Sequence, residues 1–210
     1  MDQKHFRGGV AVVTGAGSGL GASMVGRFAD GGMQIVALDI DEENAEATAQ
    51  RARDRGGAAI AKCVDVANWD ALLAAAAAAE EAFATCSIVC ANVGVQQFGT
   101  LDALTDADWR WVLDVNVMGV INTVNAFLPL LRKSGGHRHI VITSSSSALT
   151  PGIRLGAYVT SKYAVTGYGE TLRMELAAEN IGVSILFPAG MSTRHLESSI
   201  RAACSKSAPP

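Results

Sequence analysis

The fold is decided by the stretch Thr14-Gly15-Ala16-Gly17-Ser18-Gly19-Leu20-Gly21. It follows the apolar run Val10-Ala11-Val12-Val13 and precedes a helical stretch over residues 22–30. The order is therefore strand, glycine turn and helix. Glycines let the backbone turn tightly and approach a pyrophosphate, and the helix N-terminus offers it free N–H groups. A glycine pattern alone is a weak signal, but the strand before this one makes it a candidate dinucleotide site.

The next apolar run, residues 34–38, ends at Asp39. This is about the separation expected for the acid that binds the ribose hydroxyls of adenosine. Four carboxylates stand within residues 39–43, and they would repel a 2′-phosphate. Neither Ala16 nor Ile40 supplies the cation that would attract one. The sequence therefore predicts NAD as the cofactor in preference to NADP.

Tyr158 and Lys162 stand four residues apart in an expected helix, so they lie on one face of it. A free phenol has a pKa of about 10 and accepts protons poorly near neutral pH. A lysine ammonium at roughly 5–6 Å, with an effective dielectric near 20, favours the phenolate by about 3 kcal/mol, or about two pKa units. We therefore expect Lys162 to lower the pKa of Tyr158. Taken alone, such a pair is more often a solvated surface pair. Whether it is catalytic therefore depends on the other motifs in the sequence.

A serine cluster, Ser144-Ser145-Ser146-Ser147, follows the run His139-Ile140-Val141-Ile142-Thr143, which indicates a buried strand. Open parallel sheets bind ligands at the carboxyl ends of their strands. A serine hydroxyl there can donate to or accept from a substrate oxygen. The alternative is a serine-rich turn without chemistry, and four adjacent serines leave open which one would act.

These residues resemble the short-chain dehydrogenase/reductase family over nearly the whole chain. The resemblance rests on the glycine turn, Asp65-Val66 after the third strand, Asn92-Val93-Gly94 after the fourth, Asn116 in a long helix, the serine cluster and Tyr158-x-x-x-Lys162.

The resemblance implies a role for each catalytic residue. Tyr158 would be the general acid/base, and Lys162 would bind the nicotinamide ribose and lower the pKa of the tyrosine. The family commonly places its serine thirteen residues before the tyrosine, which selects Ser145 to orient the substrate oxygen. Asn116 would anchor a water in the proton relay.

The same resemblance implies further cofactor contacts. Asp65 and Val66 would lie near the adenine, Asn92 and Gly94 would line the cofactor groove, and Thr193 would contact the nicotinamide carboxamide. It also implies that the helices of Asn116 and Tyr158 pair across a two-fold axis, giving a homodimer or higher homo-oligomer.

The chain departs from the family pattern in two places. Pro188-Ala189-Gly190 stands where the family usually has Pro-Gly, although Thr193 keeps its usual distance from the proline. Seventeen residues follow Thr193, where family members continue for several dozen through a substrate-covering segment and a seventh strand. We expect residues 205–210 to form a frayed tail. A truncated chain, a natural short form and part of a longer product all remain open.

Strands and helices alternate along the chain, which predicts a parallel α/β sheet. We expect one NAD-binding domain over residues 1–204, with a Rossmann-like, doubly wound sheet of six strands in the order 3-2-1-4-5-6, helices on both faces and no seventh strand. The expected strands lie near residues 9–14, 34–39, 58–64, 87–91, 138–144 and 182–187. The expected helices lie near residues 18–30, 42–55, 68–84, 103–132 and 157–180.

Composition agrees with a single soluble domain. The 210 residues, 49% of them hydrophobic, suffice for one large core. A net charge of −3 gives no reason to expect nucleic acid or an anionic membrane as a partner. Residues 1–7 lack the apolar core of a secretory signal, and no segment has the length and purity of a membrane span, so we expect a cytoplasmic protein. No disulfide is expected, and His137 and His139 lack the partners of a metal site.

The sequence thus predicts an oxidoreductase that transfers hydride between NAD and an alcohol or ketone. The apolar stretches 149–155 and 191–196 could border the substrate, which favours a hydrophobic secondary alcohol or its ketone. Two alternatives remain. One is a dinucleotide-binding protein without turnover, because the substrate-covering segment is missing, and the other is an NADP-linked carbonyl reductase.

Overall fold

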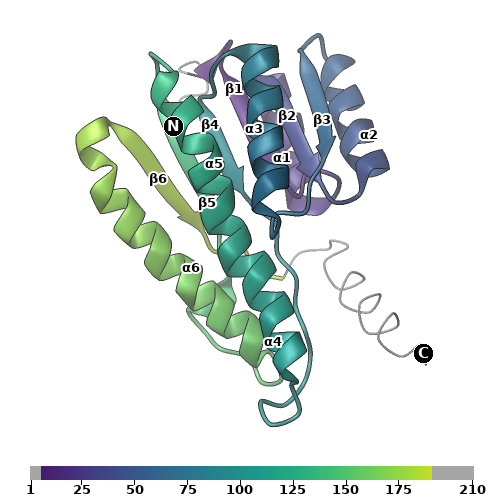
Figure 1. The fold of residues 1–210 in the computed structure, drawn as a ribbon, viewed down its shortest axis with the longest axis vertical. Coiled ribbons are helices and arrows are strands. Elements are labelled where there is room, and N and C mark those ends of the chain that lie inside the picture. The colour runs from purple at the N-terminus through teal and green to yellow at the C-terminus, as the bar shows by residue number, and fades with distance from the viewer. Residues whose placement is uncertain (1–5, 191–210) are drawn as a thin grey trace.

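Six parallel strands form one sheet in the order β3-β2-β1-β4-β5-β6, which confirms the expected Rossmann-like strand order (Figure 1). The computed structural model describes residues 6–190 of the chain. The strands are β1 (Val10–Thr14), β2 (Gln34–Asp39), β3 (Ala59–Cys63), β4 (Ile88–Ala91), β5 (Arg138–Thr143) and β6 (Ile181–Leu186). The order reverses between β1 and β4, so a crevice is expected at their carboxyl ends.

Helices cover both faces of this sheet. They are α1 (Gly19–Asp30), α2 (Glu42–Arg53), α3 (Trp69–Phe83), α4 (Asp106–Leu113), α5 (Gly119–Lys133) and α6 (Gly156–Glu175). Helices α1 and α2 share one buried cluster with the sheet, and α3, α5 and α6 share another. Successive side chains of β1 point to opposite faces of the sheet and so contribute to both clusters. Val10 and Val12 pack in the cluster with α3, α5 and α6, whereas Ala11 and Val13 pack in the cluster with α1 and α2.

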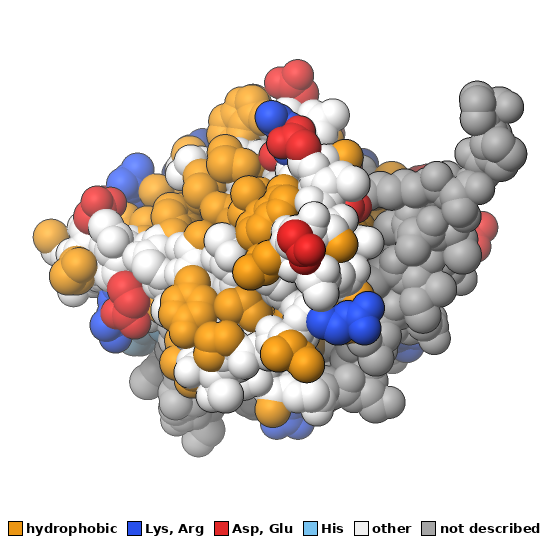
Figure 2. Space-filling model, turned by 90° about the horizontal axis from the view of Figure 1, so that it is seen from below, with side chains coloured by type: hydrophobic (Ala, Val, Ile, Leu, Met, Phe, Trp, Pro, Cys, Tyr) orange, Lys and Arg blue, Asp and Glu red, His pale blue; other side chains and the backbone are white. Residues whose placement is uncertain are grey.

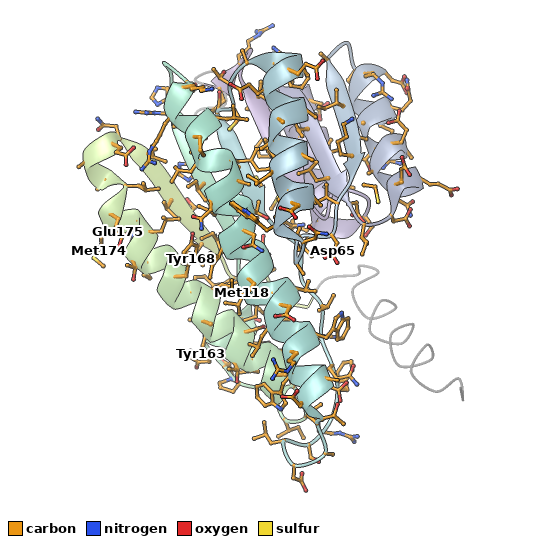
Figure 3. All side chains as sticks on the ribbon, viewed as in Figure 1. Asp65, Met118, Tyr163, Tyr168, Met174 and Glu175 are labelled. Atoms are coloured by element: carbon orange, nitrogen blue, oxygen red, sulfur yellow. The ribbon has the colours of Figure 1, made fainter. Side chains whose placement is uncertain are left out.

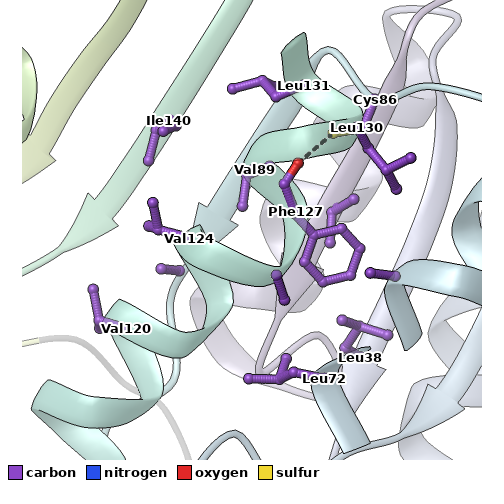
Figure 4. Close-up of a cluster of buried hydrophobic side chains, with 14 of the residues drawn as sticks. Leu38, Leu72, Cys86, Val89, Val120, Val124, Phe127, Leu130, Leu131 and Ile140 are labelled. Atoms are coloured by element: carbon purple, nitrogen blue, oxygen red, sulfur yellow. Dashed lines mark hydrogen bonds between the residues drawn. The ribbon is translucent and has the colours of Figure 1, made fainter. Parts of the chain in front are cut away.

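The larger cluster is centred on Phe127 of α5, whose ring is fully buried between the helices and the sheet (Figure 4). Leu38 of β2 and Leu72 of α3 lie in the same cluster. Cys86 lies there too, and its thiol donates to the carbonyl oxygen of Phe127 at 3.8 Å. Burial of a side chain of this size contributes about 1.5–3 kcal/mol, which fixes α5 against the sheet that carries the crevice.

The helix expected near residues 103–132 begins later and is interrupted. Thr105 and Asp108 form a capping box that starts α4 at Asp106. A π-helical turn, η2 (Asp114–Met118), then separates α4 from α5. Similarly, the helix expected near 157–180 ends at Glu175, and Asn180 follows in the left-handed conformation. Residue periodicity does not reveal such local changes of helical type, because the apolar stripe continues through them.

The continuous helical run Asp106–Lys133 corrects one sequence-based expectation. It is long enough to cross a membrane and has a mean hydropathy of 1.3 over its most apolar 18 residues. However, 44% of that window is buried, and α5 packs against β4 and α3. The hydropathy is that of a core helix in this fold.

Candidate active site

A cleft of about 820 Å³ opens at the carboxyl ends of the strands, on both sides of the point where the strand order reverses. Its lining includes the glycine turn, Asp39, Asp65, Asn92, Ser145 and Tyr158. The fold therefore brings most of the predicted site residues into one cavity, although they come from six separate loops or elements. Thr193 and the stretch 191–196 lie outside the described residues, as do Cys204 and the expected tail at 205–210.

The glycine turn is shaped by close backbone approach. Gly15 has φ +66°, and a Cβ at Gly21 would lie 1.9 Å from the carbonyl oxygen of Gly15, so no side chain fits there. Ser18 is the N-cap of α1, but its side chain makes no capping hydrogen bond. Because Gly19 and Leu20 line the cleft, the first-turn N–H groups of α1 can bind a phosphate there.

Asp39 at the end of β2 is tied directly to the glycine turn. Its Oδ2 accepts a hydrogen bond from the Gly17 N–H at 2.8 Å, and its Oδ1 accepts from the Asp41 N–H at 3.0 Å. Ile40, 69% exposed, lines the cleft beside it. Among the described residues that line the cleft, Lys162 is the one cation. The end of the cleft at Asp39 therefore carries negative charge, as the carboxylates within residues 39–43 led us to expect.

Asn92 joins three strands at the base of the cleft. Its backbone N–H donates to Thr14 Oγ1 at 3.0 Å, and its Nδ2 donates to the Thr14 carbonyl oxygen at 3.2 Å. Thr143 Oγ1 in turn donates to Asn92 Oδ1 at 3.1 Å. These bonds connect the ends of β1, β4 and β5. The sequence placed Asn92 in the groove but did not reveal the two threonines that hold it.

Asn116 lies fully buried in the π-helical turn η2. Its Oδ1 accepts from the Val95 N–H at 2.7 Å, and its Nδ2 donates to the Val95 carbonyl oxygen at 2.8 Å and to Ser161 Oγ at 2.9 Å. Both Nδ2 hydrogens are therefore used within the protein. The side chain thereby fixes the loop after β4. No Nδ2 hydrogen is left for a water, so a water held by Asn116 would have to donate a hydrogen bond to one of its oxygens.

Ser145 and Tyr158 meet inside the cleft. The Tyr158 hydroxyl hydrogen bonds with Ser145, whose Oγ also accepts from the Ser147 N–H at 3.1 Å. Ser144 instead directs its Oγ to the Lys162 carbonyl oxygen at 3.1 Å, on the backbone of α6. The structure thus places Ser145, and not Ser144, beside the phenol, and Ser145 is the serine that the family spacing selected among the four.

Burial sets the protonation of the Tyr158 and Lys162 pair. Only 2% of Lys162 is exposed, and desolvation lowers its pKa to about 8. Its Nζ donates to the Thr143 carbonyl oxygen at 3.0 Å and lies 5.5 Å from the centre of the Tyr158 ring. Desolvation raises the pKa of Tyr158, and the hydrogen bond from Ser145 only partly opposes this. The expected lowering of the Tyr158 pKa by Lys162 is therefore not achieved by the chain's own groups.

The remaining predicted residues also line the cleft. Asp65 Oδ1 accepts from the Ala67 N–H at 2.9 Å, which turns the chain into α3, and Val66 packs behind it. A Cβ at Gly94 would lie 3.1 Å from Lys162 Nζ, so this glycine leaves room for the ammonium. Pro188 begins the departure from the family pattern, and its carbonyl oxygen accepts from the Ser146 N–H at 2.9 Å.

Comparisons with known proteins identify relatives of this chain. The family model described as short chain dehydrogenase matches residues 9–203. A Mycobacterium tuberculosis protein named "Probable oxidoreductase EphD" is 36% identical over 189 residues, which are 90% of this chain and 32% of that protein. The chain therefore spans about a third of the length of the first curated relatives that it matches.

Two solved structures resemble the whole described fold. A short chain dehydrogenase/reductase from Burkholderia phymatum in complex with NAD has a TM-score of 0.91 and 36% identity, covering 98% of this chain and 75% of that one. Carveol dehydrogenase from Mycobacterium avium in complex with NAD has a TM-score of 0.88 and 28% identity, covering 99% and 80%.

Proposed function

This chain belongs to the short-chain dehydrogenase/reductase family, and we propose that it transfers hydride between NAD and a hydrophobic secondary alcohol or its ketone. The observation that carries the proposal is the hydrogen bond between Tyr158 and Ser145, in the same cleft as the glycine turn and Lys162. It brings a proton donor and an orienting hydroxyl together where a substrate oxygen could bind.

NAD is the proposed cofactor because the cleft fits its parts. The glycine turn leaves space that a Cβ would fill, and the start of α1 offers backbone N–H groups to the pyrophosphate. Asp39 stands where the adenosine ribose would bind, with Ile40 and, among the described lining residues, no cation beside it. The NAD complexes of the two structural relatives support the same choice. The other proposed contacts are Asp65, Val66, Asn92, Gly94, Tyr158, Lys162 and Thr193.

The chain's own residues would handle the proton. NAD supplies the hydride acceptor when it is bound. Ser145 and Tyr158 would hold the alcohol oxygen, and the phenolate of Tyr158 would take the hydroxyl proton as the C–H hydride leaves and the carbonyl forms. Ketone reduction reverses each transfer. Lys162 supplies one positive charge toward the phenolate, and the charge on an oxidised nicotinamide ring would add to it. Tyr158 would therefore be acidic enough only with the oxidised cofactor beside it.

A hydrophobic substrate fits the end of the molecule where α4 and α6 begin. Leu155 lines the cleft there, and the loops before these helices expose four large apolar side chains. These are Phe98, Leu101, Leu149 and Ile153. Figure 2 views this end and shows hydrophobic side chains gathered across the middle of the face. Apolar surface of this kind favours the apolar body of a ligand over a charged one.

The proposal includes a homodimer formed through the outer faces of α5 and α6. Tyr163 and Met174 are exposed on α6, and Met118 is exposed at the end of η2, directly before α5 (Figure 3). On α6, Tyr163, Gly167 and Met174 recur at helical spacing, and a Cβ at Gly167 would meet nothing within 4 Å. An open glycine between exposed apolar residues suits close packing by the same helix of a second copy.

The test combines cofactor binding with turnover. The purified chain would be titrated with NADH and NADPH by fluorescence, and a panel of secondary alcohols would then be screened for NADH production. We expect tighter binding of NADH and oxidation of apolar alcohols. Tighter binding of NADPH would favour an NADP-linked reductase, and NADH binding without turnover of any alcohol would favour a dinucleotide-binding protein.

A further inference from the structure

We propose that Gln96 is a specificity residue whose amide binds a second, uncharged oxygen of the substrate. The preferred alcohol or ketone would then carry a further hydroxyl or carbonyl group. The inference rests on the proposed function and deepens it by naming the substrate class. It concerns a residue that neither the glycine turn nor the Tyr158 and Lys162 pair involves.

Gln96 is a buried polar side chain on the wall of the cleft. Only 6% of it is exposed, yet it lines the cavity that holds Ser145 and Tyr158. Its amide makes no hydrogen bond to any of the described residues, whereas the amides of Asn92 and Asn116 are both bonded to protein. The amide is not among the fully buried unpaired polar atoms of the described residues, so it opens onto the cleft, where water or a ligand can complete its hydrogen bonds.

The backbone on both sides of Gln96 is held in place. Asn116 bonds both the N–H and the carbonyl oxygen of Val95, at 2.7 and 2.8 Å. Beyond Gln96, the Gly99 N–H donates to the Arg154 carbonyl oxygen at 3.1 Å, and Gly99 also forms a bridge with Leu155. The segment 95–99 is thus held at one end by Asn116 and at the other by Arg154 and Leu155, directly before α6. Gln96 is therefore a rigidly mounted group and not part of a loose loop.

Gln96 also lies close to the proposed reaction centre. A Cβ at Gly94 would be 3.1 Å from Lys162 Nζ. Two residues of chain span at most about 7 Å, so the backbone of Gln96 lies within that distance of Gly94. If the reacting oxygen of a substrate binds Tyr158, substrate atoms only a few bonds from the reacting carbon would lie beside Gln96.

The chemistry of the amide selects the class of substrate group. A primary amide both donates and accepts hydrogen bonds, so it suits a hydroxyl or a carbonyl oxygen. A carboxylate would need a cation, and Lys162 is the only one among the described lining residues. Sites built to hydrogen bond a substrate oxygen reject analogues without it much more strongly than apolar pockets reject an added group.

The experiment compares matched pairs of secondary alcohols, each pair differing by one further hydroxyl or carbonyl near the reacting carbon. We expect the parent enzyme to prefer the oxygen-bearing member by about tenfold or more in kcat/KM. Gln96→Leu should remove most of this preference, chiefly through KM, without changing NADH binding. Gln97→Leu is the matched control, because Gln97 is adjacent but does not line the cleft, and it should keep the preference.

Gln96→Glu gives a second, independent readout. A carboxylate only accepts hydrogen bonds, so this variant should favour the hydroxyl-bearing members over the carbonyl-bearing ones. Equal preference in the parent and both Gln96 variants would overturn the inference while leaving the proposed function intact. Failure of every alcohol to yield NADH would overturn the proposed function, and with it the role of Gln96.

Discussion

Lys162 Nζ donates a hydrogen bond to the carbonyl oxygen of Thr143 at 3.0 Å, across the gap between α6 and the end of β5. Among the described residues the ammonium has no carboxylate partner. A nearly fully buried cation held by a neutral carbonyl is costly, because the interior solvates charge poorly. The site therefore carries a local destabilisation that its proposed chemistry explains, since the charge is needed beside Tyr158.

Replacing Lys162 by Met should stabilise the protein at neutral pH. Burial lowers the pKa of Lys162 from near 10.5 to about 8. Below pH 8 the lysine is protonated in both the folded and the unfolded chain, so the folded state bears the full cost of the charge. As pH rises from 8 to 10.5 the folded chain releases this proton first, and the cost is relieved. We expect Lys162→Met to raise the free energy of unfolding at pH 7 by about 1–3 kcal/mol.

Urea denaturation of the parent and Lys162→Met at pH 7 and pH 10 measures this difference. The advantage of the variant should shrink toward pH 10. Burial raises the pKa of Cys86 and Cys90 to about 12, which changes stability at high pH in both proteins alike, so the comparison isolates Lys162. A variant less stable than the parent at pH 7, or an advantage that grows with pH, would contradict the prediction.

Tyr158→Phe should abolish most turnover and preserve the fold. The substitution removes the hydroxyl that hydrogen bonds with Ser145 but keeps the ring against α6. General acid/base groups contribute about a hundredfold to ten-thousandfold to rates, so kcat should fall by that range, whereas NADH binding, to which Tyr158 is one of several proposed contacts, should weaken far less. Steady-state kinetics and NADH fluorescence measure the two effects separately. Near-full turnover by the variant would refute the assigned role.

Asp39→Asn should relax the preference for NAD over NADP. The amide keeps an oxygen that can accept the hydrogen bond from the Gly17 N–H, so the glycine turn is retained while the charge is lost. A like charge at close range costs on the order of 1–3 kcal/mol, so the ratio of NADPH to NADH affinity should rise by about tenfold. Adding Ile40→Arg should raise it further, because Ile40 is exposed in the cleft. Parallel titrations of both cofactors test this, and an unchanged ratio in the single variant would contradict it.

The sequence predicted the parallel sheet and the cleft because both follow from local pattern, and the strand order was expected as that of a Rossmann-like fold. Alternating strands and helices determine a parallel sheet, and the glycine turn after β1 marks the switch point. The pKa of Tyr158 could not be predicted in the same way. The sequence shows a cation four residues away, but the desolvation that raises the pKa comes from elements far apart in the chain. Gln96 received no role from the sequence for the same reason, since only packing reveals that it is largely buried and makes no hydrogen bond to the described residues.

Disruption of the outer face of α6 should convert a dimer to a monomer. Tyr163 and Met174 are both exposed on this helix, and Met174 is 71% exposed. Charged side chains at both positions would have to be buried by a second copy, which is unfavourable without partners. We expect Tyr163→Glu with Met174→Glu to halve the mass measured by light scattering. Leu73→Glu, at an exposed apolar residue of α3, should leave the mass unchanged. A parent protein that light scattering shows to be a monomer would contradict the proposed dimer.

Two glycines of α1 provide a matched pair for the cofactor turn. A Cβ at Gly21 would lie 1.9 Å from the Gly15 carbonyl oxygen, so Gly21→Ala must displace backbone. A Cβ at Gly26 would first meet Arg55 Nη1 at 2.8 Å, the end of a flexible side chain that can move. Gly26→Ala should therefore stabilise the helix by up to about 1 kcal/mol, whereas Gly21→Ala should destabilise the protein by about 1–3 kcal/mol.

The two variants should also differ in NADH binding. Opening the turn at Gly15 moves the backbone that is proposed to contact the pyrophosphate, so Gly21→Ala should weaken NADH binding by about tenfold or more. Gly26→Ala lies one turn further along α1 and should bind NADH as the parent does. Thermal unfolding and fluorescence titration of both variants measure the two effects. If Gly21→Ala folded stably and bound NADH as tightly as Gly26→Ala, the turn would not be the pyrophosphate site.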